Sequence, residues 1–114
     1  MEKTKIDVQE LARVLKLLGD STRLSIMQYV SKGECCVCEL VELLDMSQPA
    51  ISQHLRKLRD ANLVVENRKR KWIFYRINEH HVAYELIHQL LEELPSVDDE
   101  FEELDRKNLR IICD

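Results

Sequence analysis

Residues 46–77 decide the fold, and they read MSQPAISQHLRKLRDANLVVENRKRKWIFYRI. Near the start of this stretch, Ser47 can cap a helix that carries Pro49 in its first turn, where a missing N–H group costs nothing. Four apolar residues then recur at helical spacing, namely Ala50, Ile51, Leu55 and Leu58. This spacing predicts an amphipathic helix with one buried face.

After this helix the pattern changes to two short runs of β-branched and aromatic residues, 63–66 and 72–75. The charged segment 67–71 separates them, so the sequence predicts a hairpin. Upstream, apolar periodicity predicts a helix over 7–18, a second helix that stops at Gly33, and a short third helix. Helices joined by a tight turn and followed by a hairpin are typical of a winged helix-turn-helix. We therefore expect an α+β fold that is mostly helical.

Charge is strongly segregated along the chain, although the net charge is only −4. Residues 47–76 contain eight basic and two acidic side chains, whereas residues 92–114 contain nine acidic and three basic ones. A solvated face explains the acidic end. The basic block falls on the predicted helix and hairpin, where polar groups could reach base edges and cations could contact phosphates. The expected DNA-binding residues are Ser47, Gln48, Ala50, Ser52, Gln53, His54, Arg56 and Lys57 on the helix, and Arg68, Lys69, Arg70 and Lys71 on the hairpin.

The chain of 114 residues has room for one domain with a modest core. A last long helix is expected to be capped by Asn78 and to end at Pro95. We place the winged helix-turn-helix domain at 1–94 and an acidic C-terminal tail at 95–114. The weak apolar periodicity of the tail is compatible with a further short helix.

Four cysteines are the main chemical feature: Cys35, Cys36 and Cys38 lie at the start of the third predicted helix, and Cys113 lies in the tail. The first ten residues lack a secretory signal and no apolar run could span a bilayer, so we expect a cytoplasmic protein with no membrane partner. A reducing cytoplasm favours metal ligands or reactive thiols over a disulfide framework. A helix N-terminus lowers a thiol pKa, and thiolates select soft ions such as arsenic, antimony, lead, cadmium or zinc.

Other functions would use the same thiols. In a redox or persulfide sensor of this fold, oxidation of the cysteines would release DNA. A thiol oxidoreductase lacks a thioredoxin-like βαβ context here, so we do not expect an enzyme. A metal-storage protein would leave the basic helix and hairpin without a purpose.

Four motifs resemble those of the ArsR/SmtB family of metal-sensing repressors, and the resemblance spans about residues 7–93. The motifs are LLGDSTRL at 17–24, ECCVCEL at 34–40, MSQPAISQHL at 46–55 and WIFYRI at 72–77. The resemblance implies a homodimer built on the first and last helices, which binds double-stranded operator DNA and loses operator affinity when metal binds. Both helices carry more apolar surface than one small core needs, so symmetric dimerisation is physically sensible. The domain at 1–94 would then serve both DNA binding and dimerisation.

The ECCVCEL motif resembles the cysteine-valine-cysteine metal box of the family. This resemblance implies arsenite or antimonite as the inducer, bound by Cys36 and Cys38. Some arsenic-binding relatives have a further cysteine three residues on, where this sequence has Val41. Cys35 or Cys113 must then supply the third thiolate, or the site is two-coordinate. Cadmium, lead and zinc stay open as alternative inducers.

Zinc-sensing relatives have a second site on the last helix. Glu79 and His81 match the first two positions of that site, but Glu92 and Pro95 stand where a histidine and a further ligand are expected. Because only half of the site is present, we expect zinc to act poorly as an inducer.

Helix geometry predicts how the cysteine cluster must be arranged. On an undistorted helix Cys36 and Cys38 would point about 200° apart, whereas Cys35 and Cys38 would share a face. We therefore expect the cluster to begin at or just before the helix, and an ion to draw Cys36 and Cys38 together while fraying the first turn. Because this helix precedes Ser47, fraying would tilt the recognition helix and disfavour DNA binding.

Overall fold

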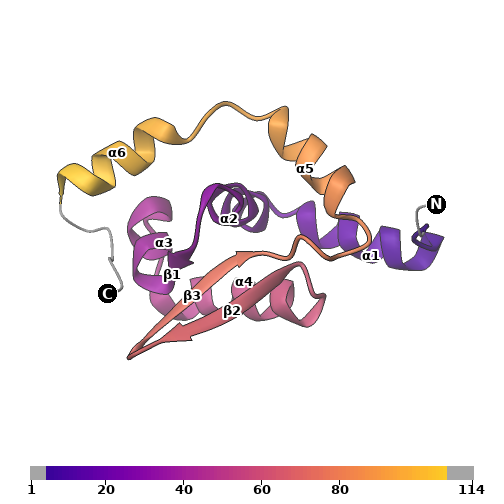
Figure 1. The fold of residues 1–114 in the computed structure, drawn as a ribbon, viewed down its shortest axis with the longest axis horizontal. Helices are drawn as coiled ribbons and strands as arrows, with labels where there is room; N and C mark the ends of the chain where they lie inside the picture. The colour runs from indigo at the N-terminus through magenta and orange to yellow at the C-terminus, as the bar shows by residue number, and fades with distance from the viewer. Residues whose placement is uncertain (1–4, 108–114) are drawn as a thin grey trace.

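The computed structural model describes residues 5–107, which form six helices and three strands (Figure 1). In chain order these elements are α1 (Val8–Leu18), α2 (Ser21–Lys32), β1 (Cys35–Cys36), α3 (Val37–Leu44), α4 (Gln48–Asp60), β2 (Val64–Lys69), β3 (Trp72–Ile77), α5 (Tyr84–Glu92) and α6 (Asp98–Arg106). Helices α3 and α4 form the helix-turn-helix, and the β2–β3 hairpin forms its wing. The predicted winged helix-turn-helix is confirmed.

The turn between α3 and α4 is fixed by local chemistry. Asp45 ends α3 in the left-handed region, with a φ of 51°. The Ser47 hydroxyl then accepts a hydrogen bond from the Ala50 amide at 3.3 Å, and Pro49 lies in the first turn of α4. This cap satisfies one of the amides that a helix start leaves without a backbone partner. The start of the recognition helix is therefore where the sequence predicted it.

The wing is an antiparallel hairpin, as predicted. Val64 lies opposite Ile77 at its base, and Lys69 lies opposite Trp72 at its far end. Arg70 makes the turn with a φ of 58°. In Figure 1 the hairpin extends beyond the helical body on the side of α4.

A third strand, which the sequence did not predict, joins the wing to the cysteine cluster. Cys35 lies opposite Tyr75 and Cys36 opposite Phe74, so that β1 pairs antiparallel with β3 and the strand order is β1-β3-β2. A strand of two residues has no periodicity of its own, and only its partner strand reveals it.

The core lies between α2, α4 and the inner face of the sheet. Of the four residues of α4 that were predicted to face inward, Ile51, Leu55 and Leu58 are fully buried and Ala50 is half-buried. They pack in one cluster with buried side chains from the other elements, including Val14, Ile26, Leu40, Leu63 and Ile87. This core holds α4 and the wing in a fixed relation.

The last long helix was predicted to begin after a cap on Asn78, and this prediction is wrong. Strand β3 continues to Ile77, and the Asn78 side chain is used in a turn, where it accepts from the His80 amide at 3.0 Å and donates to the Asn62 carbonyl at 2.8 Å. The His81 ring accepts from the Ala83 amide at 3.0 Å. These side-chain bonds compete with helix formation, so α5 begins only at Tyr84.

The short helix that the tail periodicity suggested is present as α6, and it packs against the domain. Val97 and Leu104 are buried, and the Phe101 ring meets the Tyr29 ring edge-on at 5.6 Å. Figure 1 shows α6 above α3, and the connection from α5 to α6 passes above α2. The division of the chain between residues 94 and 95 stays a prediction.

Apolar side chains remain exposed on α1 and α5. The larger ones are Val8, Leu15, Leu86 and Leu90, which are 40% to 83% exposed. They are the apolar stripes that the sequence placed on the first and last long helices. Over the described part of the chain, no helix combines the length and apolarity that a membrane span requires.

Candidate functional site

Helix α4 presents a polar outer face that is accessible to a partner. Gln48, Gln53, Arg56 and Lys57 are exposed, and Ser52 is half-buried. The Gln48 amide donates to the Ser52 hydroxyl at 3.3 Å, which orients both groups on the first two turns. Glutamine amides in this position suit hydrogen bonds to base edges in a major groove.

His54, which was also predicted to bind DNA, contacts the first turn of α2 in the structure. The His54 Nδ1 and Arg23 Nη1 atoms are 3.2 Å apart, and Arg23 Nε donates to the Leu17 carbonyl at 2.8 Å. The pKa of Asp20 is lowered, chiefly because the Arg23 backbone amide donates to its carboxylate. His54 thus anchors α4 to the body of the protein.

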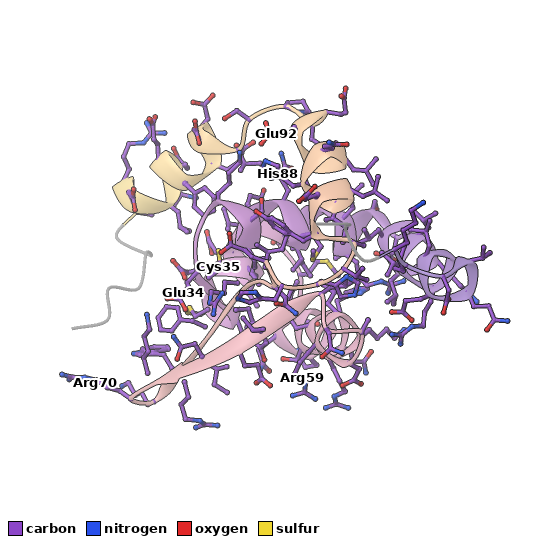
Figure 2. All side chains as sticks on the ribbon, turned by 45° about the vertical axis from the view of Figure 1, so that its right-hand side comes forward. Glu34, Cys35, Arg59, Arg70, His88 and Glu92 are labelled. Atoms are coloured by element: carbon purple, nitrogen blue, oxygen red, sulfur yellow. A yellow bond between two sulfur atoms is a disulfide. The ribbon has the colours of Figure 1, made fainter. Side chains whose placement is uncertain are left out.

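Three of the four predicted wing cations are exposed, and the fourth has a structural partner. Arg68, Arg70 and Lys71 are exposed, and Figure 2 shows Arg70 at the tip of the hairpin. Lys69 is half-buried: its ammonium group lies 2.6 Å from the Glu34 carboxylate and 5.3 Å from the centre of the Phe74 ring.

Glu34, the residue immediately before the cysteine cluster, is tied to the wing, a role that the sequence analysis did not predict. Besides Lys69, its carboxylate accepts from the Asn67 side chain at 3.2 Å. The pKa of Glu34 is lowered, first by the hydrogen bond from Lys69. In the sequence, Glu34 is only an acidic residue before Cys35. Its contact with the wing could be inferred only after β1 was known to pair with β3.

A second link connects α4 to the wing. Arg59 Nη1 lies 2.7 Å from the Glu66 carboxylate on β2, and the Tyr75 hydroxyl lies 3.3 Å from the other oxygen of that carboxylate. Burial is the first cause of the raised pKa of Tyr75. Figure 2 shows Arg59 on the lower side of the molecule, the side from which the hairpin extends. The recognition helix and the wing are therefore held together by charged groups as well as by the core.

Cys36 and Cys38 are brought together at the start of α3. Cys36 has an extended backbone, with φ −86° and ψ 165°, and stands immediately before the helix. Its amide donates to the buried Glu39 carboxylate at 2.8 Å. The two sulfur atoms are joined as a disulfide, and the two Cα atoms are 5.4 Å apart. Cys36 is buried and Cys38 is exposed.

This arrangement confirms that the cluster begins just before the helix and corrects one geometric expectation. Because Cys36 is extended, the two sulfur atoms of the disulfide meet beside an intact first turn of α3, and the fraying expected when an ion binds stays a prediction. Cys35 and Cys38 do not share a face, since Cys35 lies in β1, fully buried, with its sulfur 3.6 Å from the Gly33 carbonyl oxygen. The angles expected between Cys35, Cys36 and Cys38 on an ideal helix therefore do not describe this cluster, because only Cys38 lies in α3. Cys113 lies outside the described residues.

A cavity of about 400 Å³, open to solvent, is lined by both Cys36 and Cys38. It lies between α3, the first residue of α4 and the strand β3 with the turn before it. Its lining is mostly apolar and consists of Cys36, Val37, Cys38, Val41, Gln48, Lys71, Trp72 and Ile73. One cavity is thus lined by residues of the cysteine cluster, of α4 and of the wing.

The half-site predicted for zinc is not assembled within the described chain. Glu79 is exposed, His81 accepts from a backbone amide, and Glu92 pairs with His88 at 3.5 Å (Figure 2). Within residues 5–107, no three side chains of histidine, cysteine, aspartate or glutamate come together as metal ligands.

Comparison with known proteins assigns the family. The model for bacterial regulatory proteins of the arsR family matches residues 20–65. An arsenical resistance operon repressor of Staphylococcus aureus is 38% identical over 82 residues, which cover 72% of this chain and 78% of the repressor. The chain therefore belongs to the ArsR family of bacterial regulators, as its motifs suggested, and its relatives are regulators of transcription and not enzymes.

The arsenical resistance operon repressor of Escherichia coli K12 is 44% identical over 73 residues, which cover 63% of this chain. The match spans only 62% of that repressor.

Solved structures of the family have the same fold. Reduced HlyU from Vibrio cholerae superposes with a TM-score of 0.69 at 30% identity, covering 77% of this chain and 92% of HlyU. The homodimeric winged helix-turn-helix domain of Mb0332 from Mycobacterium bovis gives a TM-score of 0.63 at 25% identity, covering 83% of this chain and 94% of that domain.

Proposed function

We propose that this protein is a cytoplasmic, homodimeric repressor that binds operator DNA through α4 and the wing and is released when arsenite or antimonite binds Cys36 and Cys38. The observation that carries the proposal is that Cys36 and Cys38 line one cavity together with Gln48 and the residues Lys71 to Ile73 at the start of β3. A soft ligand at these thiols would act directly on the DNA-reading elements. Arsenical resistance repressors among the relatives support the same ligand class.

DNA would be read by the exposed side chains of α4, with Gln48 and Gln53 at base edges and the cations at phosphates. The wing would place Arg68, Arg70 and Lys71 along the backbone of the duplex. Ser47 and Ala50 lie at the start of the helix, where backbone amides favour a phosphate.

Dimerisation would cover the exposed apolar residues of α1 and α5. An isologous interface brings the same patch of each subunit together, and Leu86 and Leu90 provide such a patch on α5. The homodimeric state of the Mb0332 domain supports this assembly. Two copies of α4 would then face successive major grooves.

The coupling between the thiols and DNA would run through β1. Cys36 pairs with Phe74 in the sheet, and Glu34, two residues earlier, holds Lys69 of the wing. A change in the position of Cys36 would therefore act on the wing whether or not the first turn of α3 frays. For inorganic arsenite or antimonite, a third thiolate would come from Cys113 or Cys35, and Cys35 would have to leave the core to reach the ion.

Serine variants test the proposal. Cys36→Ser and Cys38→Ser should each bind operator DNA with unchanged affinity and lose release by arsenite, measured by fluorescence anisotropy with a reducing phosphine present. Cys113→Ser and Cys35→Ser identify the third ligand by the same assay. Normal release from Cys36→Ser or Cys38→Ser would refute the thiol site. Zinc acting at lower concentration than arsenite would refute arsenite as the inducer.

A second candidate function is a thiol-based redox or persulfide sensor, and the disulfide between Cys36 and Cys38 favours it. Peroxide would take two electrons and two protons from the thiols, forming the S–S bond and two molecules of water. Release by peroxide, reversed by the phosphine, together with no response to arsenite, cadmium or lead, would support this function against the first.

A further inference from the structure

The cavity beside Cys36 and Cys38 is larger and more apolar than a bare metalloid ion needs. Its volume is about 400 Å³, and Val37, Val41, Trp72 and Ile73 form much of its wall. Phe74 and Tyr75, the next residues of β3, are buried, so the wall is backed by the core. Thiol binding alone gives this apolar space no role.

Among residues 5–107, the cavity also lacks a third thiol for an inorganic arsenic ion. Inorganic arsenite has three exchangeable hydroxyl groups, and three thiolates would replace them all. Within the described residues the cavity offers two sulfur atoms, and the position one turn after Cys38 is occupied by Val41. An arsenic atom held by these two thiolates alone would keep one hydroxyl group that no thiol replaces, and the mostly apolar lining of the cavity offers that hydroxyl little to bind.

We propose, on the basis of the function proposed above, that the inducer is a trivalent arsenical carrying one apolar organic substituent. Such a compound, R–As(OH)₂, has two exchangeable hydroxyl groups, which match the two thiols. Its third substituent is already bound through carbon and occupies the cavity against Val41 and Trp72. The two thiols then bind the arsenic atom, and the apolar pocket holds the organic substituent.

The binding step balances without any change of oxidation state. The Cys36 and Cys38 thiols, in their reduced form, each form an As–S bond. Two As–O bonds break, and each thiol proton leaves with a hydroxyl group as water. Arsenic stays trivalent, so no oxidant or reductant takes part.

The same pocket explains how the substituent would release DNA. Gln48 is the first residue of α4 and Lys71 lies at the wing turn, and both line the cavity. A substituent that fills the space presses on both DNA-reading elements at once. Differential contact of this kind is what shifts an equilibrium between bound and released states.

Val41 offers a series of variants at one position. Val41→Phe fills the cavity, Val41→Ala enlarges it, and Val41→Cys adds a third thiol one turn after Cys38. A comparison within this series is needed because adjacent thiols on any protein bind organic arsenicals. The probes are phenylarsonous acid and arsenite, added to the reduced full-length protein on operator DNA.

Wild type should be released by phenylarsonous acid at a concentration about 10- to 100-fold lower than by arsenite, as expected for burial of an aromatic ring. Val41→Phe should lose most of this preference while still responding to arsenite, and Val41→Ala should keep it. Val41→Cys should move the preference toward arsenite. The single tryptophan, Trp72, should change its fluorescence with phenylarsonous acid and much less with arsenite.

The outcomes separate the inference from the proposed function. Release by arsenite at equal or lower concentration than by phenylarsonous acid overturns the inference and leaves the function intact. An unchanged preference across the Val41 series also overturns it. Failure of both arsenicals to release wild type refutes the proposed function itself. Cys113→Ser with an unchanged response to phenylarsonous acid supports two-thiol binding, and loss of that response overturns it.

Discussion

The wing cations should differ sharply in their contribution to DNA binding, because the structure gives them different surroundings. Arg68 and Arg70 are exposed, whereas Lys69, between them, is held by Glu34 at 2.6 Å. Neighbouring residues of a strand point to opposite faces, so Arg68 and Lys69 cannot both face the duplex. Arg68→Gln combined with Arg70→Gln should therefore weaken the salt dependence of binding, and Lys69→Gln should leave it nearly unchanged.

The size of the effect follows from counterion release. Each phosphate contact contributes about −0.9 to the slope of log K against log salt concentration on duplex DNA. Two arginines in each subunit of a dimer make about four contacts, so the slope should become less negative by about 3.6 in the double variant. Lys69→Gln is the matched control, with an expected change of less than about 1. Fluorescence anisotropy from about 50 to 200 mM salt measures both slopes.

Two results would contradict this reasoning. An unchanged slope in the double variant would mean that the wing does not contact phosphates. An equal loss in Lys69→Gln would mean that the pair with Glu34 opens on DNA. The double variant should also weaken operator and random DNA alike, because phosphate contacts carry no sequence information.

Three further outcomes are expected. Leu104→Ala should lower the free energy of unfolding in urea by about 2–5 kcal/mol, because Leu104 of α6 is buried; a change near zero would mean that α6 does not stabilise the domain. Glu34→Gln should destabilise the protein at neutral pH but not in acid. The pKa of Glu34 is lowered by the hydrogen bond from Lys69. The stability that ionised Glu34 contributes is therefore present above the unfolded pKa of about 4.3 and is lost as the pH falls through the folded pKa. A penalty that persists in acid would assign the effect to packing. Leu86→Asp and Leu90→Asp should each convert a dimer to monomer in sedimentation and weaken operator binding, and an intact dimer would place the interface elsewhere.

Features set by local chemistry could be predicted from the sequence. Ser47 and Pro49 mark the start of α4 because a cap and a proline in the first turn have few other structural meanings. The change after Asn62 from apolar residues at helical spacing to runs of β-branched and aromatic residues predicted the position of the wing. The three clustered cysteines indicated the candidate thiol site, because they are close in the sequence itself.

Features set by contacts between distant residues could not be predicted. Cys36 is extended because β1 pairs with β3, almost 40 residues later in the sequence. That pairing removes the angular conflict between Cys36 and Cys38 that an ideal helix would impose. Similarly, the start of α5 depends on the use of Asn78 to hold the Asn62 carbonyl, and only the folded chain brings these two residues together.

The position of the thiol site within the sheet has a thermodynamic consequence. Strand β3 pairs with Cys36 on one side and with β2 of the wing on the other. The position of β3 that favours DNA binding therefore also determines where Cys36 lies. If a thiol ligand lowers operator affinity by some factor, operator DNA must lower the affinity of the thiols for that ligand by the same factor. Trp72 lines the thiol cavity at the start of β3, so its fluorescence should measure ligand binding with and without operator DNA. A ligand affinity that is equal with and without operator DNA would mean that Cys36 and the wing are not coupled, even though they share a strand.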